Sequence, residues 1–186
     1  EGFVKGITDK RWYQDRKCGF WDEWSNPKIV QEKALQKASM QADFPIPEKG
    51  FTPSKEFLKQ IQLEETDLGP IYGYQWRNFS KQYQNLHGEI LSSSDILWHN
   101  MDGLPCGFDQ LKSIVDKLKT SPYDRRMVCS AWNPSQIDMM ALPPCHWGWN
   151  VVVYGNKLNL IWHQRSCDLL LGVGANIASY GLLLEL

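Results

Sequence analysis

Cys145 is the side chain in this sequence best placed to act as a nucleophile. It follows Pro143 and Pro144, which lack a backbone N–H and cannot continue a helix or a central strand. The thiol therefore stands where an element begins, a position that can face a cleft. A free cysteine taken alone more often packs as a small hydrophobic residue, and His146 beside it is likewise more often structural. A second group is needed to support a reactive thiol.

Arg165 and Asp168 are candidates for that second group, because they stand in a strongly apolar part of the sequence. A charge that enters a core normally needs a partner or a ligand. One interpretation is that Arg165 and Asp168 pair with each other. The other is that Arg165 faces Cys145, where its fixed positive charge favours the reactive thiolate. In the second case the two residues are a nucleophile and its activator.

Two further groups have side chains that suit a ligand. Arg125 and Arg126 place two guanidinium groups on a loop, which suits bidentate recognition of a phosphate, although adjacent arginines are more often only solvated. Trp21 and Trp24 flank two carboxylates, and a flat heterocycle could stack on their indoles. Aromatic pairs are more often part of a core, but nine tryptophans exceed what a domain of this size needs for packing.

Helices are predicted before and after the middle of the chain. Residues 27–66 are polar and interrupted by prolines, with helical patterns at 28–40 and 54–63, and they are interpreted as a surface insertion. Between Asp109 and Lys119 the apolar residues fall at helical spacing and Pro122 follows shortly after. This pattern predicts an amphipathic helix.

Strands are predicted over 127–132, 149–154 and 157–163, where apolar runs or alternation have strand length. Gly155 and Asn156 between the last two tolerate positive φ and favour a tight hairpin turn. Residues 175–186 return to helical spacing and would pack against that sheet. The predicted class is therefore mixed α and β.

Composition limits the class of protein. The 186 residues are 42% hydrophobic and 22% charged, which fits one globular domain. Twenty basic and 21 acidic side chains leave a net charge of -1, so no general attraction to nucleic acid or membrane is expected. The five cysteines are scattered without a C-x-x-C pair, which argues against disulfides and zinc and favours a reducing, cytoplasmic compartment. The apolar end, 169–186, is too interrupted for a membrane span.

Eight segments of distinctive residues follow one another in a fixed order: 3–6 (FVKG), 21–24 (WDEW), 67–77 (DLGPIYGYQWR), 124–126 (DRR), 130–134 (SAWNP), 140–146 (MALPPCH), 164–168 (QRSCD) and 176–180 (NIASY). Their order resembles the thymidylate synthase family over nearly all of the chain except the insertion. We interpret the chain as the central part of such a protein with both ends missing, as one catalytic domain over 1–186. Glu1 stands two residues out of register with the family's catalytic Glu and is not assigned that role.

The resemblance implies an α+β fold in which a mixed or antiparallel sheet packs against helices and presents one face to a homodimer interface. Its implied reaction is reductive methylation of dUMP to dTMP with 5,10-methylenetetrahydrofolate, through addition of Cys145 to carbon 6 of uracil. The phosphate would meet Arg165 and Ser166 of one subunit and Arg125 and Arg126 of the other. The implied site residues are, for catalysis, Cys145, Tyr72, His146, Asn176 and Arg165; for substrate binding, Arg125, Arg126, Gln164, Arg165, Ser166, Asp168 and Asn176; and for the folate, Trp21, Trp24, Asp168 and Gly172.

Departures from the family pattern keep alternatives open. Asn176, rather than Asp, favours uracil over cytosine, because an amide can donate at one ring position and accept at the other. Gly174 and Ala175 replace the usual Pro-Phe, and a smaller Ala175 could admit water in place of hydride, as in the related dUMP hydroxymethylases; compensated repacking is the other interpretation. From a different class, the chain could be a non-catalytic nucleotide or RNA binder, against which the near-neutral charge counts.

Overall fold

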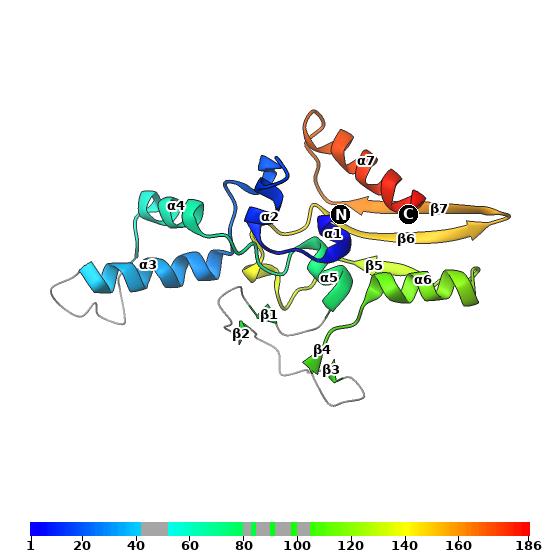
Figure 1. The fold of residues 1–186 in the computed structure, drawn as a ribbon, viewed down its shortest axis with the longest axis horizontal. Helices are drawn as coiled ribbons and strands as arrows, with labels where there is room; N and C mark the ends of the chain where they lie inside the picture. The colour runs from blue at the N-terminus through cyan, green and yellow to red at the C-terminus, as the bar shows by residue number, and fades with distance from the viewer. Residues whose placement is uncertain (42–51, 80–82, 85–89, 92–97, 100–104) are drawn as a thin grey trace.

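The computed structural model describes residues 1–41, 52–79, 83–84, 90–91, 98–99 and 105–186. The predicted α+β class is confirmed: a three-stranded antiparallel sheet, in the order β5-β6-β7, packs against helices (Figure 1). The helical elements are α1 (Gly2–Lys5), α2 (Lys10–Gln14), η1 (Gly19–Trp21), α3 (Pro27–Gln41), α4 (Lys55–Glu64), α5 (Tyr72–Asn78), α6 (Gln110–Thr120), η2 (Ile137–Met139) and α7 (Gly172–Glu185). The strands are β5 (Val128–Ser130), β6 (His146–Tyr154) and β7 (Lys157–Gln164), with two short pairs, β1 (Tyr83–Gln84) with β2 (Ile90–Leu91) and β3 (Trp98–His99) with β4 (Pro105–Cys106).

The hairpin of β6 and β7 turns where the sequence predicts it. Gly155 has φ +58°, a conformation that glycine adopts without strain, and Tyr154 pairs with Lys157 across the turn. The pairing then runs regularly to Gly148 opposite His163 and shifts by one residue between Gly148 and His146. A β-bulge changes the direction in which side chains point. This one determines which residue of the segment after β7 lies opposite Cys145.

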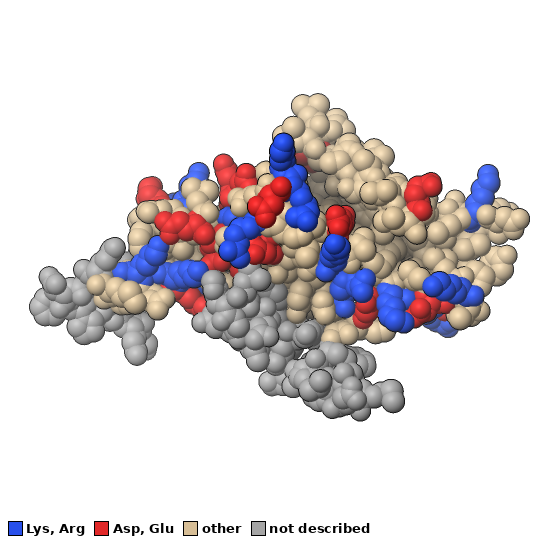
Figure 2. Space-filling view, in the orientation of Figure 1, with Lys and Arg blue, Asp and Glu red and all other residues tan. Residues whose placement is uncertain are grey.

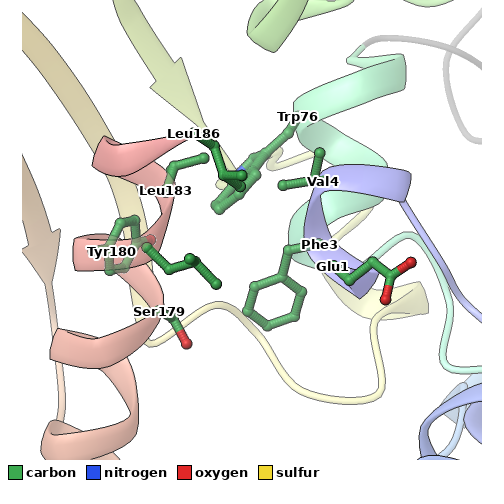
Figure 3. Close-up of a pocket in the computed structure, with 9 residues that line it drawn as sticks. Glu1, Phe3, Val4, Trp76, Ser179, Tyr180, Leu183 and Leu186 are labelled. Carbon is green, nitrogen blue, oxygen red and sulfur yellow. The ribbon is translucent and has the colours of Figure 1, made fainter.

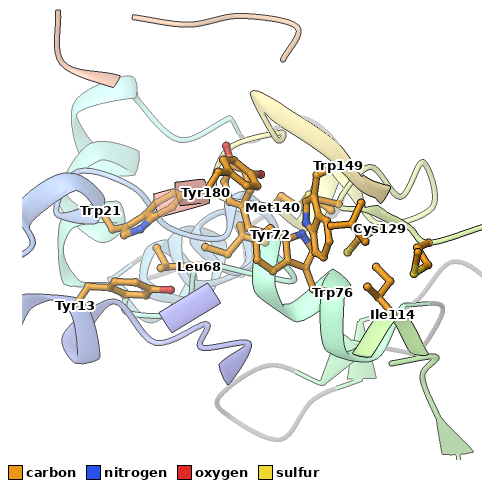
Figure 4. Close-up of a cluster of buried hydrophobic side chains, with 14 residues drawn as sticks. Tyr13, Trp21, Leu68, Tyr72, Trp76, Ile114, Cys129, Met140, Trp149 and Tyr180 are labelled. Carbon is orange, nitrogen blue, oxygen red and sulfur yellow. The ribbon is translucent and has the colours of Figure 1, made fainter. Parts of the chain in front are cut away.

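The two faces of the sheet differ. On the inner face Cys129, Trp149 and Trp162 form one row, and this row packs against α7 through Tyr180, whose ring stacks on that of Trp162 with centroids 5.4 Å apart. The aromatic core continues from there to α5 and η1 (Figure 4). The outer face carries exposed apolar side chains: Val128, Trp147, Val152, Tyr154 and Ile161.

The predicted helices at 28–40 and 54–63 are confirmed as α3 and α4. Ser54 caps α4, because its hydroxyl accepts a hydrogen bond from the Phe57 N–H (3.2 Å). The two helices form a small core of their own around Val30, Ala34 and Ile61. Residues 42–51 of the predicted insertion, including Pro45 and Pro47, lie outside the described residues.

The predicted helix over 109–119 is confirmed as α6, with the Asp109 carboxylate accepting from the Lys112 N–H (2.9 Å) as its N-cap. The C-terminal helix, α7, begins three residues before the predicted start at Ala175. Asp168 shapes the turn before the helix, because its Oδ1 accepts from the N–H groups of Leu170 and Leu171 (3.0 and 2.8 Å).

Charged side chains gather over α2, α3, α4 and α6, whereas α7 and the adjoining hairpin show few of them (Figure 2). In the described part of the chain, none of the helices has the length and apolar character that crossing a bilayer requires.

Glycine is required where α1 meets α5, because a Cβ on Gly73 would overlap the backbone of Phe3. The backbones of these helices therefore touch at that point.

Candidate active site

Cys145 lies directly before β6, as its two preceding prolines predict, and it is half-buried. Across the hairpin the Arg165 N–H donates to the Cys145 carbonyl oxygen (2.9 Å). The Arg165 side chain folds back over the same segment: Nε donates to the Pro144 carbonyl oxygen (2.9 Å) and Nη2 to that of Pro143 (2.8 Å). Nη2 also lies 3.9 Å from the Cys145 Sγ. The guanidinium is thus fixed beside the sulfur, where positive charge stabilises a thiolate.

Of the two interpretations of Arg165 and Asp168, the geometry favours the one in which Arg165 faces the thiol. Asp168 instead accepts backbone hydrogen bonds at the start of α7. The expectation that these charges enter a core is wrong, since both residues are exposed. Their apolar neighbours Leu169, Leu170 and Leu171 are exposed as well, which is why an apolar stretch of sequence did not mean burial here.

A column of aromatic rings supports Cys145 from the core side. The Cys145 N–H donates to the Tyr72 hydroxyl oxygen (2.9 Å), and burial raises the pKa of Tyr72, which keeps the phenol protonated. The Tyr72 ring stacks between Phe3 (centroids 5.1 Å apart) and His146 (4.2 Å). Tyr72 has φ +22°, a strained conformation that this packing and the hydrogen bond hold in place.

His146 faces the core and pairs with a residue that the sequence did not single out. Its Nδ1 lies 2.7 Å from the Tyr180 hydroxyl. Burial lowers the pKa of His146 to about 4, so the imidazole is neutral at pH 7. The spacing of four residues between Asn176 and Tyr180 on α7 could have indicated this, because residues i and i+4 share a helix face.

We expect acid to destabilise the protein through His146. Its folded pKa of about 4 lies below its ordinary value of 6.5, so between these values the unfolded chain binds a proton that the folded protein does not. The free energy of unfolding should therefore have its full value above about pH 6.5 and fall by roughly 2–3 kcal/mol as the pH drops toward 4. Urea unfolding at several pH values measures this loss. It should shrink in His146→Gln and persist in the control His163→Gln, whose ring is exposed; equal losses in both variants would contradict the assignment.

The remaining predicted substrate residues lie around the start of α7 and the end of β7. Gln164 accepts from the Trp162 indole N–H (2.9 Å) and donates to the Ser166 carbonyl oxygen (3.3 Å). Asn176 is half-buried, and its amide makes no hydrogen bond to the residues that the structure describes. Gly172 donates its N–H to the Asp168 carbonyl oxygen (2.9 Å). Ser166 and Asp168 are exposed and Gln164 is half-buried, so the segment that joins β7 to α7 forms an exposed rim beside Arg165.

Arg125 and Arg126 are exposed on the loop between α6 and β5. Asp124 shapes this loop, since its Oδ1 accepts from the Arg126 N–H (2.8 Å) and lies 3.6 Å from the Arg126 guanidinium. The Arg126 side chain is 87% exposed. Within the described part of the chain the structure does not bring these arginines to Cys145.

The two tryptophans predicted to bind a flat ligand have different surroundings. Trp21 is buried, and its ring lies 6.1 Å from that of Tyr72, which links it to the aromatic column behind Cys145. Trp24 is 37% exposed and opens onto a groove of about 340 Å³ that it shares with α4. The groove is also lined by Glu23, Lys55, Leu58, Lys59 and Gln62. An exposed indole beside two ammonium groups and one carboxylate fits a planar molecule that carries a negative group.

Sequence reasoning missed a buried amide network that joins α5, α6 and the segment after β5. Gln75 Nε2 donates to the Pro70 carbonyl oxygen (2.8 Å) and to Gln136 Oε1 (2.7 Å), and Asn133 Nδ2 donates to Gln75 Oε1 (3.1 Å). Gln110 Nε2 links the Gln75 and Ser130 carbonyl oxygens (2.9 and 2.8 Å). Fully bonded networks of this kind make a core rigid, here beneath two of the motif segments.

A separate apolar pocket of about 90 Å³ lies between α1, α5 and α7. Phe3, Trp76 and Tyr180 are among the residues that line it (Figure 3). Cys145 does not line this pocket, so the pocket is not the place where the thiol acts. It marks the other side of the aromatic column.

The sequence matches the family model for thymidylate synthase over residues 1–186. It is 36% identical over 184 residues to the thymidylate synthase of Mycoplasma genitalium, covering 99% of this chain and 52% of the relative. It is 41% identical over 162 residues to a bifunctional dihydrofolate reductase-thymidylate synthase of Zea mays and to one of Arabidopsis thaliana, covering 86% of this chain and 26% and 27% of those relatives. The chain therefore spans about half the length of the first relative and about a quarter of the other two.

Proposed function

We propose, because this chain belongs to the thymidylate synthase family, that the full-length protein converts dUMP to dTMP by reductive methylation with 5,10-methylenetetrahydrofolate. The observation that carries the proposal is the half-buried thiol of Cys145 with the Arg165 Nη2 held 3.9 Å from its sulfur. A fixed cation beside a partly accessible thiol suits a nucleophile.

Cys145 would start the reaction by adding to the pyrimidine. The thiolate forms a bond to carbon 6 of uracil, and the electron pair of the C5–C6 double bond moves to carbon 5 and oxygen 4. The Asn176 amide, free of bonds to the described residues, can donate toward the developing negative charge. The Tyr72 hydroxyl, by accepting from the Cys145 N–H (2.9 Å), fixes the direction from which the sulfur approaches.

Phosphate binding fits the exposed rim beside the thiol. Arg165 donates from Nε to the Pro144 carbonyl oxygen and from Nη2 to that of Pro143, so Nη1 remains for a phosphate oxygen, with Ser166 and Gln164 next to it. Arg125 and Arg126 would complete the phosphate site of the other subunit of a homodimer. The exposed apolar outer face of the sheet, which includes Val128, Trp147, Val152 and Ile161, supports that face as the interface.

The folate would bind between the two tryptophans and the start of α7. Trp24 and its groove fit a planar molecule that carries a negative group, Trp21 closes the site toward Tyr72 (ring centroids 6.1 Å apart), and Asp168 with Gly172 would meet the pterin. When bound, the folate supplies the one-carbon unit and the hydride. We place this reaction in the cytoplasm, because Cys18, Cys129, Cys145 and Cys167 are all free thiols.

Product analysis tests the proposal. Full-length protein given dUMP and 5,10-methylenetetrahydrofolate should form dTMP and dihydrofolate in equal amounts. One observation favours a second candidate, a dUMP hydroxymethylase: Gly174 and Ala175 are both exposed, so solvent can reach this part of α7. That enzyme would release tetrahydrofolate and a hydroxymethyl nucleotide. Absence of both products would contradict an enzymatic role and favour a nucleotide or RNA binder.

A further inference from the structure

We propose that Lys10 is a positioning residue for folate binding, because it fixes the turn that carries Trp21 and Trp24 against the end of α4. The inference rests on the proposed function, in which those tryptophans bind the folate. It also assigns a role to residues 27–66, which the sequence alone suggested only as a surface insertion: the last turn of α4 would support the folate site from behind.

Lys10 is an ammonium group inside the protein, with only 1% of the residue exposed. Its Nζ donates to three backbone carbonyl oxygens, those of Asp22 (3.2 Å), Gln62 (3.3 Å) and Leu63 (3.3 Å), and lies 3.2 Å from the Ser25 hydroxyl. A buried charge is costly unless its hydrogen bonds are made. Lys10 therefore holds the tryptophan turn and the end of α4 in one fixed relation.

The turn depends on side chains for its hydrogen bonds. Three successive carbonyl oxygens each accept from a different donor: that of Asp22 from Lys10, that of Glu23 from Gln62 Nε2 (2.6 Å), and that of Trp24 from the Ser25 hydroxyl (2.7 Å). The same Ser25 hydroxyl lies 2.7 Å from the Gln62 carbonyl oxygen. Two of these three donors connect the turn to another element, and removal of either one leaves a carbonyl group without its bond.

The groove beside Trp24 is formed by the same contact. Gln62 lines it together with Lys59 and Leu58, so the distance between Trp24 and α4 determines how wide the groove is. A displacement of about 1 Å at a ligand site can change binding and rate by orders of magnitude. Loss of Lys10 should therefore weaken folate binding, while the nucleotide, held by Arg165 and its neighbours, should bind as before.

The test compares two Michaelis constants in the full-length protein. In Lys10→Met the KM for 5,10-methylenetetrahydrofolate should rise about tenfold, while the KM for dUMP should stay within about twofold. Gln62→Met removes the bond to Glu23 without burying or exposing a charge, and it should raise the folate KM in the same selective way, which keeps the proposal testable if Lys10→Met does not fold.

Lys112→Met and Gln60→Met are the matched controls, because both side chains are exposed and neither touches the turn. An equal rise of both KM values in Gln62→Met, or no rise in either, would overturn the positioning role of Lys10. The proposed function would still stand in that case. Wild-type protein without folate-dependent turnover would contradict the proposed function itself, and this inference with it.

Discussion

Replacement of Cys145 with serine should lower the turnover of dUMP by at least about 10³-fold. A hydroxyl is far less ionised than a thiol near neutral pH and is a much weaker nucleophile toward carbon 6 of the pyrimidine. The substitution changes one atom in a half-buried position, and the hydrogen bond from the residue 145 N–H to Tyr72 (2.9 Å) does not depend on the side chain. Affinity for dUMP, measured by isothermal titration calorimetry, should stay within about threefold.

Covalent trapping makes this result specific to the sulfur. With 5-fluoro-dUMP and 5,10-methylenetetrahydrofolate, mass spectrometry should find an adduct on Cys145 in the wild-type protein and none in Cys145→Ser. Cys167→Ser is the matched control, because Cys167 is an exposed free thiol close in sequence to Arg165, and it should form the adduct normally. Undiminished turnover in Cys145→Ser would falsify the nucleophile assignment.

The second large effect is expected at Arg165, where leucine should lower kcat/KM for dUMP by roughly 10³-fold. The change removes the donors to the Pro143 and Pro144 carbonyl oxygens, the positive charge beside the sulfur and the proposed ligand for the phosphate. Both kcat and KM should worsen, since one side chain serves the nucleophile and the substrate.

Alkylation of Cys145 by iodoacetamide separates these roles. Without any nucleotide, the rate in Arg165→Leu should fall relative to the wild type, because the guanidinium whose Nη2 lies 3.9 Å from the Cys145 Sγ is gone. Arg16→Leu is the control, since its guanidinium lies over the Trp12 ring, 3.8 Å from the centroid, away from the thiol. An unchanged alkylation rate with a raised KM would leave Arg165 as a phosphate ligand only.

Local signals in the sequence were enough to predict the hairpin and the helices. Gly155 and Asn156 fixed the turn between β6 and β7, and Asp109 marked the start of α6. Counting outward from that turn, however, would pair Cys145 with Ser166. The bulge between His146 and Gly148 shifts the pairing by one residue and puts Arg165 there instead. No local signal predicts a bulge at this point, because it depends on how the strand packs.

The supporting residues of the site were beyond the reach of sequence reasoning for another physical reason. Lys10 and Gln75 are buried polar residues whose partners stand far away in the chain, such as Gln62 for Lys10 and Gln136 for Gln75. Composition and periodicity predict that such residues are on the surface. Only the folded chain shows that their hydrogen bonds are made inside. For a residue implied only by the family resemblance, such as Tyr72, the structure shows the contacts by which it can support Cys145.

The absence of a side chain at Gly73 has a consequence for the thiol itself. Because α1 and α5 are in backbone contact there, Phe3 can stack on Tyr72. The Tyr72 hydroxyl oxygen in turn accepts a hydrogen bond from the Cys145 N–H. Phe3 and Tyr72 thus form a direct series of contacts from the first helix to Cys145. Even an added methyl group at residue 73 would push α1 and α5 apart and displace Cys145, although this methyl group would touch neither the substrate nor the cysteine.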